Sequence, residues 1–235
     1  MRPATPNLPF VLTIALAIVY GLPTISLAEP VVSFYGGVAV PQSSTITTTV
    51  QGTPCFFCPT STFTGSRRVT FNSSPTIGGR VGYWVDRAPW FGVAFDTSFF
   101  VARASEGFQL AEIEVIPFSF LAMVRAPLFT SETYPRGRMR PYAAVGPSLV
   151  LAHAQTNFSP SVHSDGKEWG KGPGLDIRAG LDWMFTPQLA LFTEYRFFYT
   201  HIKAERCDSL CFGNNDTTTA TLQSHMISAG LAYHF

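Results

Sequence analysis

Only 13% of the 235 residues are charged, 14% are aromatic, and the formal net charge is +1. Because ordinary globular domains are about 25% charged, the shortage of charge indicates that much of the surface does not face water. The near-neutral balance excludes the basic field that nucleic-acid-binding proteins carry, so we expect no nucleic acid among the partners.

The amino terminus has the features of a targeting segment. A basic start precedes an apolar stretch over 10–22, and the small residues Ser26 and Ala28 then occupy the two positions that a signal peptidase reads. The alternative is an uncleaved anchor, but a membrane-spanning helix needs about 20 apolar residues. We therefore predict a signal peptide over 1–28, cleaved after Ala28, and one exported domain over 29–235.

Eight runs of alternating apolar and polar residues follow the targeting segment. They cover residues 31–40, 76–85, 90–101, 114–126, 140–153, 175–185, 189–201 and 222–235. Alternation with period two is typical of β-strands, and none of the runs has the length of a transmembrane helix. An even number of strands is what closed antiparallel membrane barrels require.

The connections between the runs alternate in length. They are short at 86–89 and 186–188, intermediate at 127–139, and long at 41–75, 102–113, 154–174 and 202–221. Outer-membrane barrels have short periplasmic turns and long external loops. The sequence therefore predicts an all-β fold: an eight-stranded antiparallel up-and-down transmembrane β-barrel in the outer membrane of a Gram-negative bacterium.

If the apolar faces of the strands point outward, the inner faces collect four basic and four acidic side chains. These are Arg80, Asp96, Arg125, Asp176, Arg178, Asp182, Glu194 and Arg196. Unpaired charges in a narrow lumen would be costly, so we predict an interior network of ion pairs. Small residues make room for it, namely Gly78, Gly82, Ala144, Gly146 and Gly180. The inverse assignment would give a soluble, lipocalin-like binding barrel.

Aromatic residues gather near the ends of the predicted strands, as the two interfaces of a bilayer favour. The short-turn group is Trp90, Phe91, Trp183, Phe185, Tyr233 and Phe235, and the long-loop group is Phe99, Phe100, Phe197, Phe198 and Tyr199. A soluble barrel does not explain this clustering. In the fourth run, Leu121 and Met123 fall on the inner face, which predicts a bulge at Pro117 that shifts the phase.

These features resemble small eight-stranded outer-membrane barrels of the OmpA-like type over essentially the whole exported chain. The resemblance rests on the signal peptide and on segments 78–84, 140–149, 177–197 and 227–235. It implies that the last strand carries the signal read by the barrel-assembly machinery, on Ile227, Leu231, Tyr233 and Phe235. It also implies contact with outer-membrane lipids. We expect no wall anchoring, because no peptidoglycan-binding domain follows the barrel.

Four cysteines fall in the first and last long connections. They are Cys55, Cys58, Cys207 and Cys211. Disulfides are the expected state in an oxidising compartment. Four cysteines allow three pairings, one with two local bridges and two with bridges between the loops, and their spacing does not select among them. The alternative is a four-cysteine zinc site, which the compartment disfavours. We expect no metal and no cofactor.

The functional prediction is a non-enzymatic barrel whose external loops carry any contact with a surface ligand. An eight-stranded barrel is just wide enough to be filled by side chains, which disfavours a general porin. The alternative from another class is a hydrolase that modifies lipid A, which would need a nucleophile and a base at the outer rim. Ser224-His225 and the segment 163–165 are the candidates, and neither has the spacing of a known motif.

Overall fold

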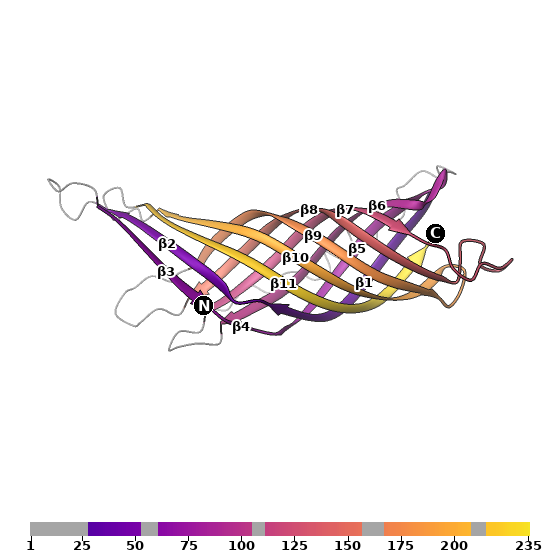
Figure 1. Cartoon of the computed structure of the whole chain (residues 1–235), viewed down its shortest axis with the longest axis horizontal. Helices are drawn as coiled ribbons and strands as arrows, with labels where there is room; N and C mark the ends of the chain where they lie inside the picture. The colour runs from indigo at the N-terminus through magenta and orange to yellow at the C-terminus, as the bar shows by residue number, and fades with distance from the viewer. Residues whose placement is uncertain (1–27, 53–60, 105–110, 157–166, 208–214) are drawn as a thin grey trace, which may run out of the picture.

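A computed structural model describes residues 28–52, 61–104, 111–156, 167–207 and 215–235, which form a single antiparallel sheet (Figure 1). The strands are β1 (Ala28–Pro41), β2 (Ser44–Gly52), β3 (Ser61–Val69), β4 (Phe71–Asn72), β5 (Ser74–Val85), β6 (Ala88–Ala104), β7 (Ala111–Arg125), β8 (Met139–Thr156), β9 (Lys167–Met184), β10 (Leu189–Cys207) and β11 (Asn215–His234). The predicted signal peptide lies outside the described residues, except for Ala28, where β1 begins.

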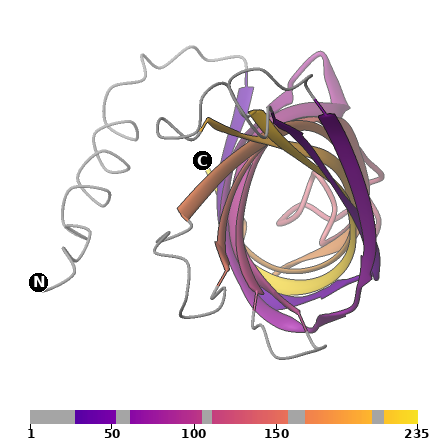
Figure 2. The ribbon, with the colours of Figure 1, turned by 90° about the vertical axis from the view of Figure 1, so that its left-hand side faces the viewer.

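Eight of these strands close into a ring, which Figure 2 shows from one end. Neighbours along the chain from β5 to β11 pair in order, and β1 pairs with β5 on one side and with β11 on the other. Every pairing in the ring is antiparallel. The predicted eight-stranded up-and-down barrel is therefore confirmed.

The two ends of the ring differ as the connection lengths predicted. Val85 pairs with Ala88 across the tight turn between β5 and β6. The turns β7–β8 and β9–β10 and the carboxy-terminal end of β11 lie at the same end, which we call the short-turn end. The longer connections lie at the opposite, long-connection end.

The connection 41–75 is not the loop that the sequence analysis expected. It contains β2, β3 and β4, and β2 pairs with the outer part of β11 while β3 pairs with β2. The short strand β4 pairs with β6. Threonine and other β-branched residues favour this extended backbone. The hairpin of β2 and β3 thus carries the sheet beyond the ring at the long-connection end (Figure 1).

The outer face of the ring is apolar. Its exposed large side chains include Phe34, Ile77, Phe95, Phe120, Val145, Ile177, Leu191 and Ile227. The inner face holds buried charged groups, so the lipocalin-like alternative is wrong. Among the described residues, no helix is long and apolar enough to cross a membrane.

Two details of the sequence analysis need correction. Phe100 and Phe198 are fully buried inside the barrel and belong to no outer aromatic band. Phe100 lies four residues after the buried Asp96, and Phe198 lies two residues after the buried Arg196. An even spacing along a strand places both rings on the inner face. The register of β7 against its neighbours is the same on both sides of Pro117. The predicted phase shift is therefore absent, and Leu121 and Met123 simply pack inside.

Candidate functional site

A network of six charged side chains crosses the middle of the lumen, with Arg178 at its centre. The Arg178 guanidinium donates to both oxygens of Asp96 at 2.7 and 2.9 Å, and to both oxygens of Asp176 at 2.7 and 3.0 Å. It also reaches Glu194 at 3.2 Å. The side chain is completely buried, so every one of these charges is held by protein groups rather than by solvent.

Two further arginines complete this central network. Arg80 donates to Asp96 at 3.3 Å and, across the lumen, to Glu194 at 2.5 Å. Arg196 contacts Asp176 at 2.7 Å. Three guanidinium groups therefore face three carboxylates, and the network is neutral. Burial of paired and hydrogen-bonded charges in this way avoids the large cost of an uncompensated charge.

Hydroxyl groups occupy the remaining acceptor positions of the carboxylates. Tyr35 donates to Asp96 at 2.8 Å, Tyr142 donates to Glu194 at 2.8 Å, and Ser119 donates to Asp176 at 2.6 Å. Gly78 and Gly180 lie directly against the two tyrosine rings, and a Cβ atom at either position would overlap a ring. These two glycines therefore make the room that the sequence analysis attributed to them.

A second charged cluster, which we call the mouth cluster, lies inside the short-turn end. The Glu29 carboxylate contacts Arg125 at 2.5 Å, Arg136 at 2.9 Å, Arg140 at 3.1 Å and His234 at 2.7 Å. The Arg125 guanidinium also stacks 4.2 Å above the Trp84 ring. Glu29 is buried, so one carboxylate ties four strands and a turn together across this end.

Apolar layers separate and cover the charged groups. Along β7 the buried inward residues are Val115, Pro117, Ser119, Leu121, Met123 and Arg125. Leu121 and Met123 belong to an apolar cluster between the central network and the mouth cluster, and Val115 belongs to a second one toward the long-connection end. The lumen is thus filled in successive layers, as expected for a ring of this size.

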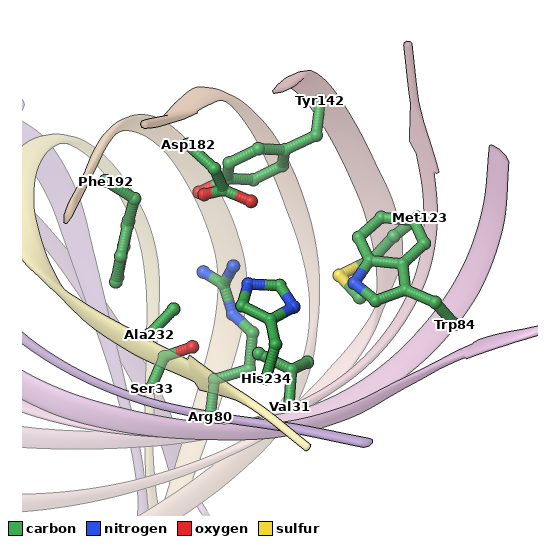
Figure 3. Close-up of a pocket in the computed structure, with 10 residues that line it drawn as sticks. All are labelled: Val31, Ser33, Arg80, Trp84, Met123, Tyr142, Asp182, Phe192, Ala232 and His234. Atoms are coloured by element: carbon green, nitrogen blue, oxygen red, sulfur yellow. The ribbon is translucent and has the colours of Figure 1, made fainter. Parts of the chain in front are cut away.

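A small cavity remains between the central network and the mouth cluster (Figure 3). Its residues are Val31, Ser33, Arg80, Trp84, Met123, Tyr142, Asp182, Phe192, Ala232 and His234. Its volume is about 20 Å³, which is roughly the room that one water molecule needs. No organic ligand fits there.

The structure places all eight predicted interior charges on the inner face, but in three different settings. Six of them, Arg80, Asp96, Asp176, Arg178, Glu194 and Arg196, form the central network. Arg125 instead pairs with Glu29 in the mouth cluster. Asp182 lines the cavity, and the described residues include no ion-pair partner for it.

Sequence reasoning missed Glu29, Arg140, His234 and the two tyrosines. The alternation contained the signal for two of them. Glu29 lies two residues before Val31 and Arg140 lies four residues before Ala144, and an even spacing places each charged residue on the inner face. Glu29 and Arg140 lie at the second positions of β1 and β8. The predicted run 31–40 began after Glu29, and the predicted run 140–153 began at Arg140 without that residue being assigned to the interior.

The other candidate residues give no catalytic arrangement among the described residues. Ser224 is buried inside the barrel, whereas His225 faces outward and contacts Tyr195 at 2.6 Å. The neighbours therefore lie on opposite sides of the wall. Within the described part of the chain, no group of His, Cys, Asp or Glu side chains could hold a metal ion.

Several predicted residues cannot be placed. Cys55, Cys58 and Cys211 lie outside the described residues, as does segment 163–165, and Cys207 ends β10. Their disulfides remain a prediction. The terminal residues are outward-facing and exposed, namely Ile227, Leu231, Tyr233 and Phe235. Their role as an assembly signal also remains a prediction.

A closed antiparallel ring with an apolar outer face and a charged inner face defines the class of integral membrane β-barrels. Comparison with protein families agrees: the chain belongs to the outer membrane protein beta-barrel domain family, whose model matches residues 12–235. The family supports an outer-membrane location.

The similarity to one solved outer-membrane protein shows the shared fold. The outer membrane protein OprG from Pseudomonas aeruginosa matches with a TM-score of 0.59 at 16% identity, over 89% of this chain and 96% of that chain. Outer membrane protein AlkL matches with a TM-score of 0.49 at 15% identity, over 100% of this chain and 97% of that chain. Neisserial surface protein A matches with a TM-score of 0.43 at 17% identity, over 86% and 97%. No curated protein matches the sequence.

Proposed function

We propose that the protein is a non-enzymatic outer-membrane barrel with a closed, salt-bridged lumen, which presents its long-connection end to the outside of a Gram-negative cell. The observation that carries this proposal is the neutral network of Arg80, Arg178, Arg196 and their three carboxylates across the lumen. Any specific contact is made outside the lumen, by the segments that the barrel holds at its long-connection end. In this proposal the exported chain lacks residues 1–28.

Three features support a closed lumen rather than a pore. The central network spans the lumen, since Arg80 on β5 reaches Glu194 on β10, and β1 and β11 lie between these two strands in the ring. Apolar clusters lie on both sides of it. The cavity between the charged layers holds about 20 Å³. An ion would have to displace buried ion pairs to pass, and breaking such a pair is costly.

A test of closure is ion conductance in a planar lipid bilayer. The folded wild-type barrel is expected to give no sustained current above that of the bare bilayer. The comparison variant carries Arg178→Ala, Phe100→Ala and Phe198→Ala together, which removes the centre of the network and two fully buried rings from the adjacent apolar layer. This variant is expected to conduct. A sustained current through the wild-type barrel would contradict the proposal.

The alternative of a lipid A-modifying hydrolase has no described Ser–His pair to support it, because Ser224 and His225 face opposite sides of the wall. Incubation of the folded barrel with lipid A, followed by mass analysis of the lipid, tests it directly. We expect the lipid to be recovered unchanged, and release of acyl chains or phosphate would overturn the non-enzymatic assignment.

A further inference from the structure

One buried carboxylate of the lumen belongs to neither charged cluster. Asp182 lies on the inner face of β9, and its side chain lines the cavity between the central network and the mouth cluster. It forms no ion pair and no hydrogen bond with any residue that the structure describes. Because an uncompensated buried charge is costly, the surroundings of Asp182 must supply both a counter-charge and a hydrogen-bond donor.

The mouth cluster supplies the counter-charge. Its buried cations are Arg125 and Arg140 and its buried anion is Glu29, so these three groups carry one excess positive charge. Arg136 is partly exposed and has a second carboxylate partner in the β5–β6 turn. Asp182 lies directly opposite Arg140 in the pairing of β8 and β9. An ionised Asp182 therefore makes the buried charges at this end of the lumen neutral.

His234 presents a ring nitrogen to the same cavity. Its Nδ1 atom lies 2.7 Å from the Glu29 carboxylate, whereas its Nε2 atom has no hydrogen-bond partner in the described part of the chain. The buried charges balance without a charge on the imidazole, so the ring is neutral. The contact with Glu29 then places the ring proton on Nδ1, and Nε2 is left as a hydrogen-bond acceptor.

Asp182 and His234 cannot satisfy each other directly. In Figure 3 the carboxylate and the imidazole face each other across the cavity, with the Arg80 guanidinium beside them. An ionised carboxylate and an unprotonated ring nitrogen are both acceptors, so a molecule between them must donate two hydrogen bonds. Arg80 and Ser33 line the same cavity and carry the N–H and O–H groups from which such a molecule can accept.

The size and charge of the cavity identify this molecule. The volume of about 20 Å³ is room for one water molecule. A chloride ion has no proton to donate, and the Arg80 guanidinium that lines the cavity repels a metal or ammonium cation. Water donates two hydrogen bonds, accepts others, and brings no charge.

We propose that the cavity is a binding site for one water molecule, which donates hydrogen bonds to the Asp182 carboxylate and to Nε2 of His234. The water completes a chain of contacts from the mouth cluster into the lumen, through Glu29, His234, the water and Asp182. It allows the buried Asp182 to remain ionised as the counter-charge of Arg125 and Arg140. The site is separate from the segments at the long-connection end, and its test is independent of the conductance test above.

The first test is a crystal structure of the folded barrel at a resolution that shows ordered water. We expect one peak of density within about 2.6–3.2 Å of both an Asp182 oxygen and Nε2 of His234. Crystals grown with thallium(I) acetate distinguish water from a monovalent cation, because bound thallium gives an anomalous signal. An empty cavity, or an anomalous peak inside it, overturns the proposal.

The second test is nitrogen NMR of the folded barrel with isotope-labelled histidine. The variant His234→Gln identifies the resonances of this ring by their loss. We expect a protonated Nδ1 and an unprotonated, hydrogen-bonded Nε2. Asp182→Asn keeps an acceptor oxygen and should keep the Nε2 resonance near its wild-type position. Asp182→Leu removes the acceptor and fills the cavity, and should shift the Nε2 resonance to the value of a free acceptor.

The matched control is Asp86→Asn, which removes a partly exposed carboxylate that does not line the cavity. It should change neither the Nε2 resonance nor the urea concentration at which the barrel unfolds. Asp182→Asn should lower that urea concentration, and adding Arg140→Gln should recover part of the loss, because it removes the uncompensated cation.

Two outcomes of the NMR experiment contradict the water bridge. One is a wild-type His234 ring that is protonated on Nε2, and the other is an Nε2 resonance that stays at the wild-type position in a folded Asp182→Leu variant. If Asp182→Leu does not fold, the density in the wild-type crystal and the tautomer of the wild-type ring decide the question.

Discussion

At the scale of single residues, the interior charges are positioned by partners across the lumen as well as by neighbours on the same or the adjacent strand. Arg80 on β5 reaches Glu194 on β10 across the lumen, and Arg178 joins Asp96 on β6 to its own strand. Seven of the eight ring strands contribute a charge or hydroxyl to the central network. The network therefore fixes strands that are not neighbours in the sheet.

Loss of Arg178 should accordingly destabilise the barrel strongly. The change Arg178→Met keeps much of the side-chain volume but leaves Asp96, Asp176 and Glu194 with only two guanidinium groups. Breaking a buried pair by removing one partner costs about 3–5 kcal/mol, and we expect a loss of that order in the free energy of unfolding. Equilibrium urea unfolding in detergent, followed by tryptophan fluorescence, measures it.

The matched control is Arg103→Met, which breaks an ion pair whose side chains are 61% and 46% exposed. An exposed pair contributes about 0–1 kcal/mol, so this variant should unfold nearly as the wild type does. Adding Glu194→Gln to Arg178→Met should recover part of the loss, because it removes one uncompensated charge. Equal effects of Arg178→Met and Arg103→Met would mean that the central network does not stabilise the fold.

The sequence predicted which residues face inward better than it predicted their partners. Period-two alternation places Arg178 and Arg196 inside because it depends only on strand geometry. Their contacts depend on which strands face each other across the ring. The alternation within a single strand carries no information about this arrangement. Phe100 shows a different error. Its place in the alternation of β6 put it on the inner face, but it was assigned to the outer aromatic band because it is aromatic.

At the scale of elements, the ring strands were predicted from sequence and the hairpin of β2 and β3 was not. A ring strand has lipid on one side and polar groups on the other, so its residues alternate in hydropathy. The segment TITTTV in β2 shows this contrast only weakly, because threonine occupies every position of one face and the middle position of the other. A polar segment with such weak alternation indicated a loop, although the β-branched threonines favour a strand.

The hairpin should be dispensable for the ring. Replacing residues 44–69 by a short glycine- and asparagine-containing turn leaves every β1–β5 and β1–β11 pair intact. We expect a folded barrel, with a modest loss of stability because Ser44 is buried and Val69 packs against an inner apolar cluster. Resistance of the unheated protein to protease, followed on gels, measures folding. Complete loss of the resistant form would show that the hairpin is part of the folding unit.

At the scale of the whole molecule, the fold depends on closing β1 against β11, the pair formed by the two ends of the barrel sequence. This seam allows very little space. A Cβ atom at Gly37 would overlap the backbone carbonyl oxygen of Ile227, and one at Gly230 would overlap that of Phe34. The strands approach so closely that glycine is required on both sides of the seam.

Gly36 and Gly37 offer a matched test of closure. Gly37→Ala places a methyl group against the backbone of β11 and should hinder the closing pair, whereas at Gly36 the nearest atom is 3.8 Å away, so Gly36→Ala should be tolerated. A closed barrel migrates faster on a mild-detergent gel before boiling than after. We expect the wild type and Gly36→Ala to show this shift, and Gly37→Ala to show a reduced folded fraction.

If Gly37→Ala folds fully while Gly36→Ala does not, the seam is not the step that limits closure. Absence of any shift in the wild type would contradict the closed ring itself, because a sheet with an open β1 edge leaves backbone groups unpaired in the membrane and would not keep a detergent-resistant compact form before boiling.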